Sequence, residues 1–205
     1  MPPSRPAARE AWPTAWLAVR AGLLAFALLI AVLAPAVSAE EPALAALLKT
    51  LDLRGYPART APPQFSGSTL DARQLSMTEY RGTVIVLTFW ASWCLECRVE
   101  MPALERLQRA FSSRGFAIVG VNARESKEAV RRYAKELGLT FPLVLDRDGK
   151  VNALYGVIGL PTTFLVGRDG RVIALAIGPR QWESAPARRL IEALLAEPAQ
   201  GTAVQ

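Results

Sequence analysis

Residues 83–97 of the chain read TVIVLTFWASWCLEC. The first eight of these residues are apolar or β-branched, which is typical of a central strand buried on both faces. Two cysteines spaced Cys-x-x-Cys follow, where the strand ends and a helix is predicted over residues 94–112. This spacing at a strand-to-helix junction, in a chain of alternating strands and helices, is a strong signal for redox chemistry.

The spacing places the sulfur atoms of Cys94 and Cys97 one helical turn apart, close enough for a disulfide bond. Cys94 lies at the start of the helix, where unpaired backbone N–H groups stabilise a thiolate. We therefore expect Cys94 to be the nucleophile and Cys97 to resolve the mixed disulfide, with no cofactor besides this pair. A purely structural disulfide is the alternative, although a bridge across so short a loop constrains the unfolded chain little.

Composition removes several other classes of chemistry. The chain has 205 residues, two cysteines and no histidine. Two thiolates alone cannot complete a tetrahedral zinc site, and triads that need imidazole are excluded, so no metal site is expected. The net charge is +6, but the basic residues are scattered among acids on predicted helices. No nucleic-acid partner is therefore expected.

The rest of the chain alternates between strand and helix patterns. A hairpin is predicted over residues 65–75, and strands over 116–122, 143–145, 162–166 and 171–177. Helices are predicted over 125–137, 151–155 and 182–195. The fold class is therefore α/β, with a central mixed β-sheet flanked by helices.

The amino-terminal segment has the composition of a targeting sequence. Arg5, Arg9 and Arg20 precede an uncharged, leucine-rich run over residues 21–39. As a helix this run spans about 28 Å, enough for a bilayer core, and its small residues before Glu40 also fit a cleavage site. Residues 1–39 are thus a signal peptide or an N-terminal membrane anchor. In both cases the following domain is expected outside the cytoplasm, in the periplasm. If the segment is an anchor, it holds the domain at the inner membrane.

Residues 40–61 are interpreted as a linker with a short amphipathic helix. Leu44, Leu47, Leu48 and Leu51 form an apolar stripe at helical spacing, and glycine and prolines follow. The catalytic-size domain is expected over residues 62–196, and a flexible tail over 197–205.

Two stretches carry a resemblance to a known family: FWASWCLECRVEMP at 89–102 and GLPTTF at 159–164. Over residues 62–196 the chain resembles the TlpA/ResA-like periplasmic redoxins of the thioredoxin superfamily. The resemblance implies a thioredoxin fold with an N-terminal β-hairpin and a central αβ insertion over 125–145. It also implies that Pro161 is a cis-proline facing the cysteines, and that Trp93, Leu160 and Thr162 join it in binding substrate. A trans proline that begins a strand is the alternative.

The chain departs from the proteins it resembles at Thr88 and at the dipeptide Leu95-Glu96, and it matches the family pattern at Glu100. Thr88 stands where thioredoxin has a buried aspartate. Glu100 matches the acid of the TlpA/ResA pattern and lies one turn beyond Cys97, so it is a candidate proton relay; a surface glutamate is the alternative. The dipeptide Leu95-Glu96 lacks the proline common there, and a carboxylate at Glu96 disfavours a nearby thiolate. Leu95 and Glu96 are thus expected to tune the pair toward reduction.

The expected function is that of a thiol-disulfide oxidoreductase, which reduces disulfides in exported proteins. Apocytochrome c and other periplasmic redox or metal-assembly factors would suit it as clients, and a membrane dithiol protein as its electron donor. One alternative is a thiol peroxidase of the peroxiredoxin type, against which the Cys-x-x-Cys pair argues. The other is a non-catalytic peptide-binding scaffold, in which Cys94→Ser would leave function intact.

Overall fold

The computed structural model describes residues 40–56 and 60–198. The predicted signal peptide or anchor, residues 1–39, lies outside the described residues, and so does nearly all of the predicted tail. Within the described part, no helix is both long enough and apolar enough to cross a membrane.

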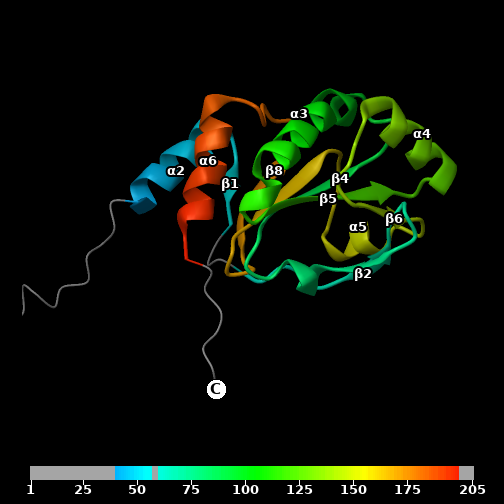
Figure 1. The fold of residues 1–205 in the computed structure, drawn as a ribbon, viewed down its shortest axis with the longest axis horizontal. Helices are drawn as coiled ribbons and strands as arrows, with labels where there is room; N and C mark the ends of the chain where they lie inside the picture. The colour runs from blue at the N-terminus through cyan, green and yellow to red at the C-terminus, as the bar shows by residue number, and fades with distance from the viewer. Residues whose placement is uncertain (1–39, 57–59, 199–205) are drawn as a thin grey trace, which may run out of the picture. The chain divides into compact units, whose positions relative to one another are not determined.

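A six-stranded mixed sheet forms the centre of the fold, in the order β1-β8-β7-β4-β5-β6 (Figure 1). Strand β4 pairs in parallel with β5, and β5 with β6, whereas β4–β7, β7–β8 and β8–β1 are antiparallel. The strands are β1 Arg54–Gly55, β4 Val84–Trp90, β5 Phe116–Ala123, β6 Leu143–Asp146, β7 Thr162–Val166 and β8 Val172–Ile177. The predicted α/β class with a mixed sheet is confirmed.

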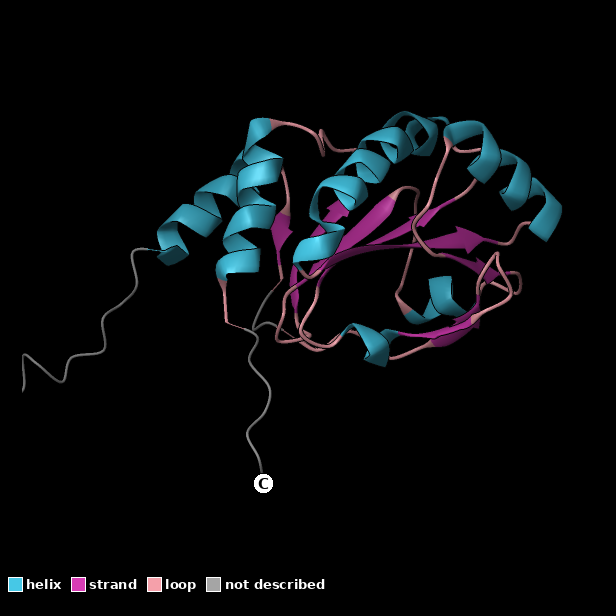
Figure 2. Ribbon diagram, viewed as in Figure 1, coloured by secondary structure: helices cyan, strands magenta, loops and turns pink. Residues whose placement is uncertain are grey.

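Helices cover both faces of the sheet, as Figure 2 shows. The helices are α2 Glu40–Thr50, α3 Leu95–Phe111, α4 Lys127–Leu137, α5 Lys150–Leu154 and α6 Ala185–Ala196. Helices α3, α4 and α6 lie on one face, and α5 and the hairpin lie on the other.

All seven positions of β4 are buried, as its apolar run predicts. Alternate side chains enter two separate apolar clusters, because successive residues of a strand point to opposite faces. Val84, Val86 and Trp90 join the cluster that contains α3, whereas Ile85, Leu87 and Phe89 pack beneath the hairpin and α5. The strand that precedes the cysteines is therefore held on both sides.

The predicted hairpin is present as β2 Ser66–Ser68 and β3 Gln74–Ser76, which pair antiparallel. It lies against β6, and Gly67 permits the close approach, because a Cβ atom there would lie 2.7 Å from Val144 Cγ1. The predicted insertion is present as well. Ser126 caps α4 by accepting a hydrogen bond from Ala129 N, and β6 extends the sheet beside β5.

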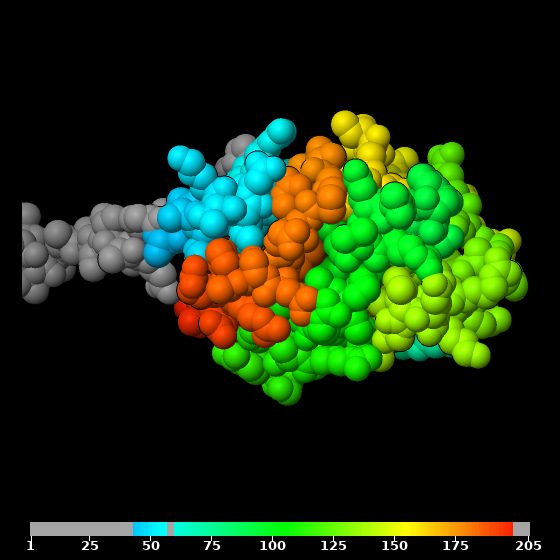
Figure 3. All heavy atoms as spheres, turned by 90° about the horizontal axis from the view of Figure 1, so that it is seen from above, coloured from blue at the N-terminus to red at the C-terminus, as the bar shows by residue number. Residues whose placement is uncertain are grey.

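The predicted short amphipathic helix is present as α2, but residues 40–55 pack into the domain instead of forming a linker before it. Helix α2 packs against α6, with Leu51 and Leu53 buried in the core, and β1 pairs with β8. Figure 3 shows the surfaces of α2 and α6 in contact, in blue and in orange to red. The reason is that a leucine stripe gains free energy by packing on an apolar surface, and the open edge of β8 accepts another strand. The folded part therefore begins before residue 62.

Candidate active site

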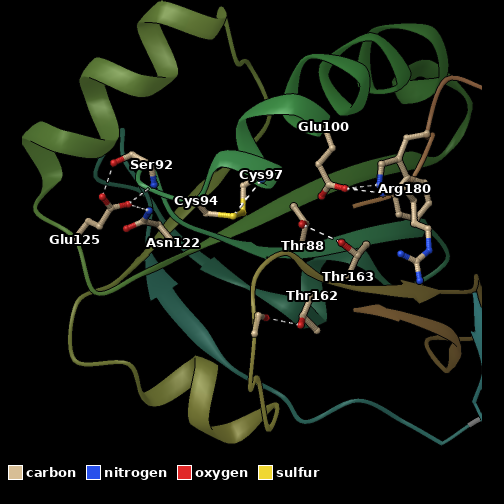
Figure 4. The surroundings of a disulfide bond; sticks show 12 residues. Thr88, Ser92, Cys94, Cys97, Glu100, Asn122, Glu125, Thr162, Thr163 and Arg180 are labelled. Atoms are coloured by element: carbon tan, nitrogen blue, oxygen red, sulfur yellow. Dashed lines mark hydrogen bonds between the residues drawn. A yellow bond between two sulfur atoms is a disulfide. The ribbon is translucent and has the colours of Figure 1, made fainter. Parts of the chain in front are cut away.

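Cys94 and Cys97 form a disulfide bond at the amino-terminal end of α3 (Figure 4). Cys94 is the N-cap residue of the helix, and its Sγ atom accepts a hydrogen bond from Cys97 N at 3.1 Å. Cys94 is 7% exposed and Cys97 is 0% exposed. Both cysteines are thus buried, and Cys94 is the one that keeps some exposed surface.

A carboxylate fixes the loop that precedes Cys94. Glu125 Oε2 accepts hydrogen bonds from Ser92 N at 2.7 Å and from Asn122 Nδ2 at 2.6 Å, and Ser92 Oγ donates to Glu125 Oε1 (Figure 4). These three residues were missed from the sequence. The available signal in the sequence was Asn122, a polar residue near the end of an otherwise apolar strand pattern. The structure shows that Asn122 is fully buried.

Glu100 is buried, with 3% of its surface exposed. Its Oε2 atom accepts hydrogen bonds from Arg180 N and from Trp182 Nε1, both at 3.2 Å. The other oxygen, Oε1, is buried and has no hydrogen-bond partner among the described residues. The alternative of a surface glutamate is therefore wrong.

The surroundings of Glu100 place its titration near neutral pH. Burial disfavours the charged carboxylate and raises the pKa to about 7, although the two N–H donors and the positive charge of Arg180 act in the opposite direction. A carboxyl group with such a pKa both takes up and releases a proton at neutral pH. Arg180 and Trp182, which supply these donors, had no signal in the local sequence pattern.

Thr88 is fully buried in β4 and accepts a hydrogen bond from Thr163 Oγ1 at 3.0 Å. At the position where thioredoxin has an aspartate, the chain thus has a neutral pair of hydroxyl groups. Figure 4 shows that pair in the sheet and Glu100 on α3. The buried acid of this site therefore comes from the helix.

The peptide bond between Leu160 and Pro161 is cis, so the alternative of a trans proline is wrong. Thr162 begins β7, and its Oγ1 atom donates to Gly159 O at 2.7 Å. Leu160 and Trp93 line one groove of about 520 Å³. Of the residues that the resemblance assigns to substrate binding, Trp93 and Leu160 therefore border a common groove, and Pro161 and Thr162 are not part of its lining.

Large apolar side chains are exposed around the disulfide. Trp93 is 71% exposed and Leu95 is 75% exposed, and Ile158, in the loop before Pro161, is 88% exposed. Glu96 is also exposed in the first turn of α3. Exposed apolar side chains grouped at a reactive centre are typical of a surface that binds another protein. In the described part of the chain, no group of three or more Cys, Asp or Glu side chains is arranged to hold a metal ion.

Comparisons with known proteins agree with this geometry. A model described as the AhpC/TSA family matches residues 58–175. The thiol-disulfide oxidoreductase ResA of Geobacillus thermodenitrificans is 41% identical over 116 residues, which cover 57% of this chain and 67% of that protein. The thioredoxin-like protein YneN of Bacillus subtilis is 39% identical over 119 residues, 57% of this chain and 69% of that protein.

A solved structure shows the same fold. The crystal structure of a thiol:disulfide interchange protein of the thioredoxin family from Chlorobium tepidum superposes with a TM-score of 0.61 at 30% sequence identity. The match covers 68% of this chain and 99% of that chain.

Proposed function

The chain belongs to the AhpC/TSA family and is a thiol-disulfide oxidoreductase, and from this premise we propose that it reduces disulfide bonds in exported proteins. The observation that carries the proposal is the Cys94–Cys97 disulfide at the start of α3, in which Cys94 keeps 7% of its surface exposed and Cys97 none. Clients are proposed to bind across Trp93, Leu160, Pro161 and Thr162.

The proposed reaction begins with the dithiol form of the protein. The Cys94 thiolate, favoured by the helix N-terminus and by the N–H group of Cys97, attacks one sulfur atom of the client disulfide. A bond forms between Cys94 and the client, the client's S–S bond breaks, and one client thiolate leaves and takes a proton from water. The Cys97 thiolate then attacks Cys94 Sγ, the internal disulfide forms, and the second client thiolate leaves. Two electrons pass from the protein to the client.

Glu100 is proposed to take the proton of Cys97 in the second step. The Cys97 thiol is fully buried, so water cannot readily remove its proton. Glu100 lies one turn further along α3, has a pKa raised to about 7 by burial, and keeps one oxygen atom without a partner among the described residues. A carboxylate with these properties is matched to a proton transfer near neutral pH.

The direction of the reaction follows from the first turn of α3. Glu96 lies there, where its negative charge opposes the thiolate-stabilising effect of the helix N-terminus. When the Cys94 thiolate is less stable, the reduced form of the pair is less stable relative to the disulfide. The reduced form is then a stronger reductant. We therefore infer a reductase rather than an oxidase, tuned by Leu95 and Glu96.

The setting of the reaction is proposed from the amino-terminal segment. With residues 1–39 acting as a signal peptide or anchor, the domain works outside the cytoplasm. Its clients there would be exported proteins such as apocytochrome c or other redox and metal-assembly factors. A membrane protein with a dithiol would return the Cys94–Cys97 disulfide to its reduced form.

The proposal is tested by equilibrating the purified protein in graded redox buffers and counting its free thiols by alkylation and mass spectrometry. We expect full interconversion of the dithiol and disulfide forms. The disulfide form should dominate in glutathione buffers and be half reduced only by a stronger dithiol reductant. A protein that never interconverts would refute the proposal, and a pair half reduced in oxidising glutathione buffer would refute the reductase direction.

Two variants complete the test. Cys94→Ser should abolish exchange, whereas a non-catalytic scaffold would be unaffected by it. Cys97→Ala should keep the first step and accumulate the mixed disulfide, so that mass spectrometry of the trapped species identifies the client bound to Cys94. Consumption of hydrogen peroxide, measured in parallel, should be negligible; a rate above that of disulfide reduction would favour the thiol peroxidase.

A further inference from the structure

Arg180, in the loop between β8 and α6, is extensively hydrogen-bonded and only 15% of its side chain is exposed. Its Nε and Nη2 atoms donate to Asp52 O at 3.1 and 2.8 Å, and Nη2 also contacts Asp52 Oδ2 at 2.9 Å. Its Nη1 atom donates to the carbonyl oxygens of Ile177, Gly178 and Pro179. The guanidinium therefore ties its own loop to the residue that follows the end of α2.

The same loop supplies both hydrogen-bond donors of Glu100. The backbone N–H of Arg180 and the indole N–H of Trp182 donate to one oxygen of that carboxyl group. Trp182 is 1% exposed and lies in the main apolar cluster. Figure 4 shows Glu100 directed from α3 toward the backbone of Arg180. The position of this loop thus determines how well Glu100 is buried and bonded.

Asp52 presents its carbonyl group from an unusual backbone conformation. Its φ is 51°, in the left-handed region, and it follows α2 where Leu53 N bonds to Leu48 O. Aspartate is one of the few residues other than glycine that adopt this conformation readily. In this conformation the carbonyl oxygen of Asp52 accepts two hydrogen bonds from the Arg180 fork.

We propose that the Asp52–Arg180 contact positions the redox site: by fastening the loop over residues 178–182 to the end of α2, it keeps Glu100 buried, one helical turn from Cys97 on α3. The inference rests on the proposed role of Glu100 as the proton acceptor. Asp52 and Arg180 are positioning residues in this scheme, because they act through Glu100 and touch neither sulfur atom nor client. Residues 40–55 are then a working part of the reductase.

The groups around Glu100 determine whether its pKa rises or falls when the loop over residues 178–182 is disturbed. Arg180 is the nearby positive charge, and Glu96 and Cys97 lie on the same helix as Glu100. Tyr133 of α4 is close enough that the charge of Glu100 raises the pKa of Tyr133. Burial is the largest influence on Glu100 and raises its pKa. A loosened loop admits water and lowers the pKa, whereas loss of a single donor from an intact loop raises it.

The test is a ¹³C NMR titration of the Glu100 carboxyl carbon in the oxidised full-length chain, assigned with Glu100→Gln. Arg180→Lys keeps the charge but loses the planar fork, so the pKa of Glu100 should fall by about one unit. Asp52→Asn tolerates the left-handed conformation and should give a smaller fall, because two of the three bonds go to the backbone oxygen of Asp52. Trp182→Phe should raise the pKa, because it removes a donor and keeps an aromatic ring in place.

Arg106→Gln is the matched control. Arg106 of α3 forms an ion pair with Glu183, just after the loop, and does not contact Glu100. This variant also breaks an arginine–carboxylate pair at the loop. The pKa of Glu100 in it should nevertheless equal that of Glu100 in the wild type. The pH profile of disulfide reduction should shift down with Arg180→Lys, up with Trp182→Phe, and not at all with Arg106→Gln.

The outcomes separate this inference from the proposed function. If Glu100 titrates in Arg180→Lys and Asp52→Asn as it does in the wild type, the positioning role is refuted, whether or not the protein is a reductase. An equal fall in Arg106→Gln would also refute it, because any loosening of the region would then suffice. If the pKa shifts as expected but Glu100→Gln leaves the pH profile of disulfide reduction unchanged, the contact controls Glu100 and the proton-relay role itself is wrong.

Discussion

At the scale of single residues, the site depends on which buried polar positions carry a charge. Thr88 and Thr163 satisfy each other's hydroxyl groups inside the sheet. Glu100 instead accepts two hydrogen bonds through one oxygen atom, and its other oxygen has no partner among the described residues. An incompletely bonded, buried carboxyl group is costly when ionised. That cost is the reason why its protonation is sensitive to pH near neutrality.

The titration of Glu100 predicts how stability depends on pH. Burial raises its pKa from the ordinary value of 4.5 for a glutamate to about 7 in the folded protein. Between these values the folded state binds more protons than the unfolded state, so the free energy of unfolding falls as pH rises. The fall should be complete above the folded-state value and amount to about 3 kcal/mol at most.

Urea unfolding of the oxidised protein at several pH values checks this prediction. The Glu100→Gln variant should lack this component, so its stability relative to the wild type should increase as pH rises from 4.5 to above 7. Parallel curves for the two proteins would contradict the prediction.

At the scale of elements, Glu125 joins two loops that meet at the carboxyl ends of β4 and β5. It connects Ser92, two residues before Cys94, to Asn122 near the end of β5. Adjacent parallel strands end at the same edge of a sheet. The insertion that contains α4 therefore holds the loop in front of the nucleophile.

Replacing Glu125 with alanine should weaken both the fold and the reaction. The variant leaves Asn122 Nδ2 buried without its acceptor, which should cost about 2–3 kcal/mol. A less constrained Ser92 backbone should slow disulfide exchange by about tenfold, because the position of Cys94 becomes less defined.

Glu128→Ala is the control, since Glu128 lies three residues beyond Glu125, exposed in the first turn of α4. It should leave both the free energy of unfolding and the rate of exchange close to those of the wild type. Stability is measured by urea unfolding, and exchange by reduction of a model disulfide. Equal losses in the two variants would show that Glu125 acts only through the helix.

At the scale of the whole molecule, the segment before α2 is expected to determine where the reductase works. After treatment of the cells with a membrane-impermeant reductant, Cys94 of the full-length chain expressed in a bacterium should react with a membrane-impermeant alkylating reagent. A version without residues 1–39 should stay in the cytoplasm and be protected. Release from membranes after carbonate treatment would favour a cleaved signal peptide, and retention would favour an anchor. A full-length chain protected from the reagent would contradict export.

The local patterns predicted the elements well. Apolar runs and periodicity identified the central strand, the helix that follows the cysteines, the hairpin and the insertion, with bounds that differ from the observed ones by at most two residues. The site was predicted where its parts are adjacent in sequence. Cys94 and Cys97 share one helical turn, so their spacing alone brings the sulfur atoms together.

By itself, the sequence determined the α/β class, the redox pair and the order of the strands and helices along the chain, because these depend on periodicities and spacings within about 20 residues. Only the tertiary structure decided that Glu100 is buried, that α2 and β1 belong to the domain, and that Arg180 links the two. Arg180 lies 80 residues from Glu100 and 128 from Asp52. Contacts across such separations arise when elements pack, and no local pattern of residue types encodes them.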